Sequence, residues 1–193
     1  DVGVFGRISF LIFIVVLGIE SARQTVARLK KGRRVEELEQ FALNDSMTGM
    51  YNRNAYDYFV KNEKDFEGYV IVTFDLNNLK QCNDQYGHRA GDEYIINAAH
   101  IIEDNFERYG KCYRIGGDEF CCIIPKGRYF KIERVMHKID QDVEILNHKN
   151  IIPVPVGIAY GYAVFTADDT DPEKVRERAD EDMYRNKKAM KQS

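Results

Sequence analysis

The chain has 193 residues, of which 44% are hydrophobic and 31% are charged, with a formal net charge of −3. These values are typical of a globular domain with an attached segment, and the slight negative charge argues against non-specific nucleic-acid binding. The four cysteines have no CxxC spacing and complete no zinc pattern with the four histidines. We interpret them as reduced thiols of a cytosolic domain.

A run from Ile8 to Ile19 that is apolar except for Ser9 follows Arg7 near the start of the chain. As a helix this run would span about 18 Å, which is less than the roughly 30 Å of a hydrocarbon core. Because the chain has no initiator methionine, we expect a fragment of a longer protein and interpret residues 1–19 as the end of a transmembrane helix. A signal peptide and a buried helix are the alternatives.

Basic residues follow this run, with no acid between positions 21 and 34. By the positive-inside rule, this bias predicts anchorage at the inner membrane, with the following domain in the cytoplasm. Residues 20–44 contain two short heptad-like seams interrupted at Gly32. We predict a signalling or linker helix there, which either pairs in a dimer or remains a single solvated helix. The turn-rich residues 45–53 end it, and Asn52 is a candidate cap for the next helix.

The segment from Tyr69 to Asp75 is a short apolar run with β-branched residues. It predicts a buried strand that ends in an aspartate. The residues from there to Asp92 are rich in glycine, asparagine and aspartate, which indicates a loop. An acid at a strand end beside such a loop favours metal and phosphate chemistry if neighbouring strands supply further acids.

Gly116 and Gly117 are followed directly by Asp118 and Glu119, with apolar β-forming residues on both sides. This pattern predicts a hairpin, in which glycine permits unusual backbone angles and close approach of a ligand. Adjacent carboxylates on a rigid turn suit a hard divalent cation and a bound phosphate, whereas the alternative is an ordinary polar turn. Asp75 can share that cation if the two strands are neighbours.

The remaining elements are an amphipathic helix over about 92–109, a second over about 132–146, a strand over 154–165 and a last helix that opens at Asp171-Pro172. Aspartate followed by proline is typical of a helix cap and first helical position. Helices that alternate with strands, with one hairpin between them, predict an α/β fold with a mixed central sheet flanked by helices.

The residues from Arg114 to Phe120 read Arg-Ile-Gly-Gly-Asp-Glu-Phe and match the signature of the GGDEF domain, the catalytic domain of diguanylate cyclases. Residues 45–53 resemble the family's opening motif, DxLTGLxNR, with methionine twice in place of leucine. Residues 75–92 resemble its DxDxFKxxNDxxGHxxGD stretch, with Asn77 at the second aspartate. The resemblance implies a catalytic domain over residues 45–193 with a palm-like nucleotidyl cyclase fold.

The family resemblance implies synthesis of cyclic di-GMP from two GTP molecules, with release of pyrophosphate. Two domains face each other in a homodimer, and each 3′-hydroxyl attacks the other GTP's α-phosphorus. The resemblance assigns Mg²⁺ (or Mn²⁺) to a set of carboxylates and one main-chain carbonyl, from Asp75, Asp118, Glu119 and Leu76 respectively. A cation there neutralises charge that develops on the phosphate, and Gly116 and Gly117 let phosphates lie against the backbone.

Asn83 and Asp92 resemble the family's guanine contacts. A carboxylate accepts from guanine N1–H and N2–H₂, whereas adenine would leave Asp92 unsatisfied. Three lysines resemble phosphate-contacting positions, namely Lys80, Lys187 and Lys191. The last two are spaced i, i+4 on one helix face, although lysine at 191 lacks the fork of the family's arginine.

Many family members carry an inhibitory RxxD site that ends five residues before the glycine pair. Glu107 and Gly110 occupy those positions here, and Arg108 is one residue out of place. We therefore expect no feedback inhibition at this site.

The leading hypothesis is an active, Mg²⁺-dependent diguanylate cyclase that works as a homodimer. The alternative is a non-catalytic regulatory module that binds GTP or a cyclic dinucleotide. A third hypothesis is a cyclase for a different dinucleotide, against which Asp92 argues.

Overall fold

The computed structural model describes residues 17–18, 20, 23, 42–127 and 131–190. By its internal contacts the chain divides into two units, residues 1–42 and 43–193. The elements of the second unit follow in the order α2 (Arg53–Asn62), β1 (Val70–Asn77), α3 (Leu79–Tyr86), α4 (His88–Phe106), β2 (Lys111–Arg114), β3 (Glu119–Ile124), α5 (Ile132–His148), β4 (Gly157–Val164) and α6 (Pro172–Met190).

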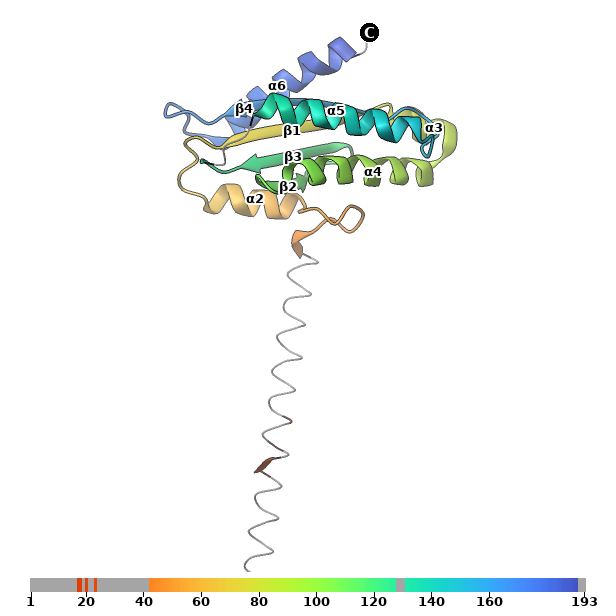
Figure 1. The fold of residues 1–193 in the computed structure, drawn as a ribbon. Coiled ribbons are helices and arrows are strands. Elements are labelled where there is room, and N and C mark those ends of the chain that lie inside the picture. The colour runs from red at the N-terminus through yellow and green to blue at the C-terminus, as the bar shows by residue number, and fades with distance from the viewer. Residues whose placement is uncertain (1–16, 19, 21–22, 24–41, 128–130, 191–193) are drawn as a thin grey trace, which may run out of the picture. The chain divides into compact units, whose positions relative to one another are not determined.

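The described strands form a four-stranded sheet in the order β2-β3-β1-β4 (Figure 1). The predicted α/β class with helices around a central sheet is confirmed. The expectation of a mixed sheet is corrected, because β1 pairs antiparallel with both β3 and β4, and β2 pairs antiparallel with β3. β1 and β2 do run in the same direction, but β3 lies between them. A parallel pairing occurs as an isolated bridge between Tyr51 and Tyr113.

Helices cover both faces of the sheet, as the near-continuous apolar sequence of β1 requires. Val72, Phe74 and Leu76 face the cluster that α4 and α5 complete, and Figure 1 shows these two helices running across the same face. Ile71 belongs to the opposite cluster, together with residues of α2 and α6. Because side chains alternate along a strand, Asp75 lies on the face that α6 covers.

The helix starts follow local capping chemistry. Asn52 caps α2, because its side chain accepts a hydrogen bond from the main-chain N–H of Ala55 at 3.0 Å. Asp171 accepts similarly from Glu173 at 3.0 Å, with Pro172 at the first position of α6. Both predicted caps are confirmed.

The predicted loop between Asp75 and Asp92 is wrong in part, because α3 and the start of α4 occupy most of it. Gly87 separates the two helices with φ of +81°, a conformation that glycine adopts without strain. Leu79 and Cys82 are buried on α3, and this tertiary burial stabilises a helix whose polar composition indicates a loop.

The prediction of an inner-membrane location is wrong by the structure. Among the residues that the structure describes, no helix is long and apolar enough to cross a membrane. Most of the residues that motivated the prediction, 1–16, 19, 21–22 and 24–41, lie outside the described part of the chain. The predicted divisions after residues 19 and 44 stay predictions.

Candidate active site

The Gly-Gly-Asp-Glu segment forms the turn between β2 and β3, as predicted. The main-chain N–H groups of Ile115 and Gly116 donate to the carbonyl of Glu119, at 3.0 and 3.2 Å. The Glu119 carboxylate lies over Gly116, where an added Cβ would be 2.8 Å from Oε2. Gly117 has open space on the side where a Cβ would project. The turn therefore holds one carboxylate against its own backbone and leaves the second glycine accessible.

The end of β1 lies directly beside this turn. Asp75 and Glu119 are register partners in adjacent strands, so their side chains share one face of the sheet. The main-chain N–H of Leu76 also donates to the carbonyl of Asp118 at 3.1 Å. Residues about forty positions apart in sequence are thus brought together, as the shared-cation hypothesis requires.

A lysine from α6 contacts the same strand end. The Lys187 ammonium forms an ion pair and hydrogen bond with the Asp75 carboxylate, and the two side chains are only 24% and 15% exposed. The resemblance assigned Lys187 to phosphate. In this structure the lysine instead balances the charge of an acid that the resemblance assigns to metal. Lys191, its predicted companion, lies outside the described residues.

The carboxylates of Asp75, Asp118 and Glu119 and the main-chain carbonyl of Leu76 suit a hard divalent cation, which prefers carboxylate and carbonyl oxygens. A further oxygen on the same face, Oδ1 of Asn77, is buried and has no hydrogen-bond partner within the described part of the chain. In this structure, however, the carboxylates do not converge on one point. Among the described residues, no group of three or more histidine, cysteine or acidic side chains is arranged to hold a metal ion.

The two predicted guanine contacts, Asn83 and Asp92, lie on α3 and α4, two helices that pack against each other. The amide of Asn83 lies against Gly91, so closely that an added Cβ would be 1.9 Å from its Oδ1. Asp92 follows Gly91 and is exposed. The base corner, where α3 packs on α4, thus holds the Asn83 amide against Gly91, the residue before Asp92. Lys80 is exposed on α3, and no described hydrogen bond or ion pair joins it to the acids.

Arg114 is a structural member of the site that sequence reasoning did not single out. Its guanidinium donates to Asp45 at 3.0 Å and to the Gly117 carbonyl at 2.8 Å, and its side chain is 11% exposed. Burial alone would raise the pKa of Asp45, but hydrogen bonds from Thr48 and Arg114 outweigh it and lower that pKa below its usual value. Arg114 therefore ties the opening motif to the glycine turn. An arginine two residues before a Gly-Gly turn was the available signal.

Gly110, which stands where the RxxD motif has its aspartate, has no room for a side chain. Gly110 packs against β3, where an added Cβ would be 2.1 Å from the carbonyl oxygen of Ile123. No side chain fits there without a backbone shift. Nearby, the Arg108 guanidinium lies over the ring of Tyr109, 4.8 Å from its centroid.

Comparison with known proteins identifies the sequence family that this domain matches. Residues 42–193 match the sequence family described as "Diguanylate cyclase, GGDEF domain". The bifunctional diguanylate cyclase/cyclic di-GMP phosphodiesterase MucR of Pseudomonas aeruginosa is 31% identical over 147 residues, which are 72% of this chain and 22% of MucR. The diguanylate cyclase DgcS of Shewanella oneidensis is 28% identical over 158 residues, 79% of this chain and 52% of DgcS. The chain therefore spans about half of one relative and about a fifth of the other.

A solved structure supports the fold. The coiled coil and GGDEF domain of DgcB from Caulobacter crescentus, in complex with c-di-GMP, aligns with a TM-score of 0.74 at 23% identity and covers 90% of this chain and 95% of that one. At this identity the likeness concerns the fold alone. The antiparallel sheet, its covering helices and the glycine turn define a GGDEF-type α/β domain. The match over residues 42–193 then places the chain in the GGDEF domain family of diguanylate cyclases.

Proposed function

We propose that this chain condenses two GTP molecules into cyclic di-GMP and pyrophosphate. The observation that carries the proposal is the convergence of the β1 end and the glycine turn. It places Asp75 opposite Glu119 and joins Leu76 to Asp118. Family membership and the intact Gly-Gly-Asp-Glu-Phe segment add to it.

Asp75, Asp118, Glu119 and the Leu76 carbonyl would hold Mg²⁺ or Mn²⁺. When bound, such a cation neutralises charge on the phosphate oxygens and assists displacement of pyrophosphate. Lys187 balances the Asp75 charge in the structure. With a cation held at Asp75, the Lys187 ammonium would be available to contact phosphate, as the resemblance implies. Gly117 leaves room for a phosphate to approach the backbone.

Asn83 and Asp92 would read the guanine base. Asp92 is exposed at the corner of α3 and α4 and accepts from guanine N1–H and N2–H₂. Adenine has a lone pair at N1, which would leave the carboxylate without a donor. This difference favours GTP over ATP.

A single domain binds one GTP, so a reaction between two GTP molecules requires two copies of the domain. Each GTP presents its 3′-hydroxyl to the α-phosphorus of the other, and each new phosphodiester bond forms as one pyrophosphate leaves. Homodimerisation therefore completes the active site and offers a point of control.

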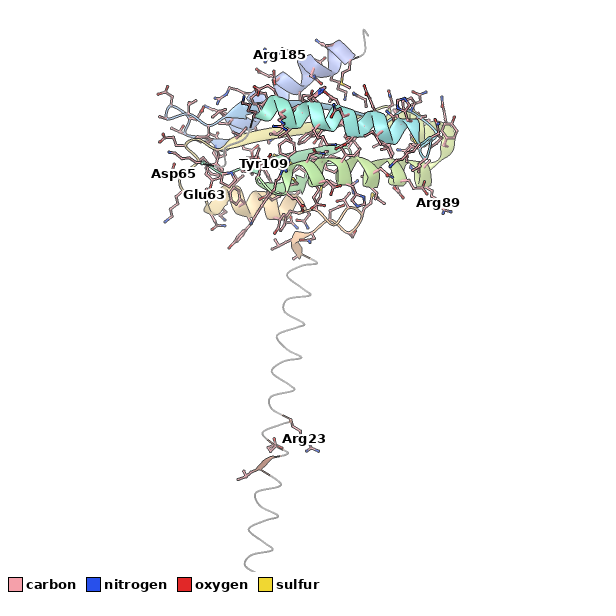
Figure 2. The ribbon with its side chains drawn as sticks, in the orientation of Figure 1. Arg23, Glu63, Asp65, Arg89, Tyr109 and Arg185 are labelled. Atoms are coloured by element: carbon pink, nitrogen blue, oxygen red, sulfur yellow. The ribbon has the colours of Figure 1, made fainter. Side chains whose placement is uncertain are left out.

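Product analysis tests the proposal. Purified protein with Mg²⁺ and an equimolar GTP and ATP mixture should give cyclic di-GMP and pyrophosphate, and Asp118→Ala should abolish both. Asp65→Ala is the matched control, since Asp65 lies at the opposite end of the domain from Arg89, which precedes the base corner (Figure 2). A different dinucleotide would refute the guanine assignment. GTP binding without any product would favour the non-catalytic regulatory module.

A further inference from the structure

Tyr94 carries a buried hydroxyl that the family motifs leave unassigned. The residue lies on α4 with 0% exposure. Its hydroxyl donates to the main-chain carbonyl of Asn77, with an O–O distance of 2.5 Å, and accepts from the main-chain N–H of Gly157 at 2.7 Å. The Gly157 carbonyl lies 3.4 Å away. Burial raises the pKa of Tyr94 to about 12, so the phenol keeps its proton at neutral pH.

The hydroxyl joins three elements at one point. Asn77 is the last residue of β1 and Gly157 the first of β4, and the two are register partners. Tyr94 itself is two residues beyond Asp92 on α4, whereas Asn77 is two residues beyond Asp75. One side chain therefore connects the helix that carries the base contact to the strand that carries the metal contact.

The Asn77 carbonyl needs this partner. After Asn77 the chain leaves the sheet through Asn78, which has φ of +62° and precedes α3. A buried carbonyl without a hydrogen bond costs about 1–3 kcal/mol, so the phenol stabilises this particular exit from the strand. The tightness of the packing is evident at Gly157, where an added Cβ would be 3.2 Å from the Cβ of Asn77.

We propose that Tyr94 is a positioning residue, whose hydroxyl fixes the distance between the base site at Asp92 and the phosphate and metal site at Asp75. This inference rests on the proposed binding of GTP across both sites. The affinity for a ligand that spans the two sites depends on their separation, whereas the affinity for a ligand that occupies one site does not. Loss of the hydroxyl is thus expected to weaken binding of the whole nucleotide, but not binding of a ligand that occupies the base site alone.

Tyr94→Phe tests the inference, with Tyr56→Phe as the matched control. Tyr56 is also 0% exposed, but its hydroxyl contacts Glu173 at 3.2 Å, in the cluster on the opposite face of the sheet. Calorimetry with a non-hydrolysable GTP analogue and Mg²⁺ should show about a tenfold rise in Kd for Tyr94→Phe, and the KM for GTP should rise in parallel. NMR titration with guanosine, which occupies the base site alone, should show an unchanged Kd. The control should change neither.

Two results would overturn the inference. The hydroxyl is merely structural if Tyr94→Phe lowers the melting temperature while both affinities stay at the wild-type value. It does not set the separation if the affinities for guanosine and for the GTP analogue fall equally. A wild-type protein that binds the analogue but makes no cyclic product would refute the proposed catalysis, and the two affinities would still decide the role of Tyr94.

Discussion

Gly91 offers the sharpest test of the base corner. In Gly91→Ala, the new methyl group would lie 1.9 Å from Oδ1, 2.8 Å from Cγ and 3.2 Å from Nδ2 of Asn83. An ordinary contact needs about 3.5 Å, so the Asn83 amide must withdraw by roughly 1.5 Å. Alanine is favoured over glycine within a helix by about 1 kcal/mol, so the variant should still fold.

The displacement of Asn83 should appear as weaker GTP binding. A neutral hydrogen bond contributes about 0.5–1.5 kcal/mol, and 1.4 kcal/mol corresponds to about tenfold in affinity. Calorimetry with a non-hydrolysable GTP analogue should therefore show a Kd raised by about tenfold, with no fall in melting temperature.

A double-mutant cycle separates displacement of the amide from other effects. With Asn83→Ala the clash disappears, so adding Gly91→Ala should weaken binding no further. If the two substitutions instead weaken binding additively, the alanine at position 91 acts through something other than Asn83, and the assignment of this corner to base contact loses its support.

Two ion pairs give further predictions. Arg114→Lys keeps the charge but cannot hold both Asp45 and the Gly117 carbonyl, so cyclic di-GMP synthesis should fall at least tenfold; unchanged turnover would refute a role in holding the turn. Hydrogen bonds from Arg178, the largest cause, hold the pKa of Asp169 well below its usual value. A depressed pKa stabilises the folded state above the unfolded value of about 4, and this contribution is lost as the pH falls from there towards the folded pKa. The difference in melting temperature between wild type and Asp169→Asn should therefore shrink between about pH 5 and pH 2. A difference that stays constant over this range would contradict the assignment.

The local features of the site could be predicted from sequence because they depend on residues close together in the chain. The glycine turn, its two flanking strands and the caps at Asn52 and Asp171 follow from turn and capping chemistry. The α3 helix could not be predicted in the same way. Its asparagines and the nearby Gly87 favour a loop, and only burial of Leu79 and Cys82 against the rest of the domain outweighs that preference.

Contacts between residues far apart in the sequence are the other part of the fold that could not be predicted. The order of helices and strands does not specify the direction in which β4 returns to β1, so the antiparallel sheet was not foreseen. The same holds for Arg114, which reaches Asp45 across 69 positions, and for Tyr94, which reaches Gly157 across 63. These contacts join segments whose proximity arises only from the complete fold.

Cyclic di-GMP synthesis by two copies of this domain acting together can be tested directly. Turnover per chain should therefore be measured at increasing protein concentration with GTP and Mg²⁺, and repeated with EDTA. We predict that cyclic di-GMP formed per chain rises with protein concentration until the dimer saturates, and that EDTA abolishes it. Absence of cyclic di-GMP at every concentration, in protein that still binds the GTP analogue, would contradict synthesis by a pair of domains.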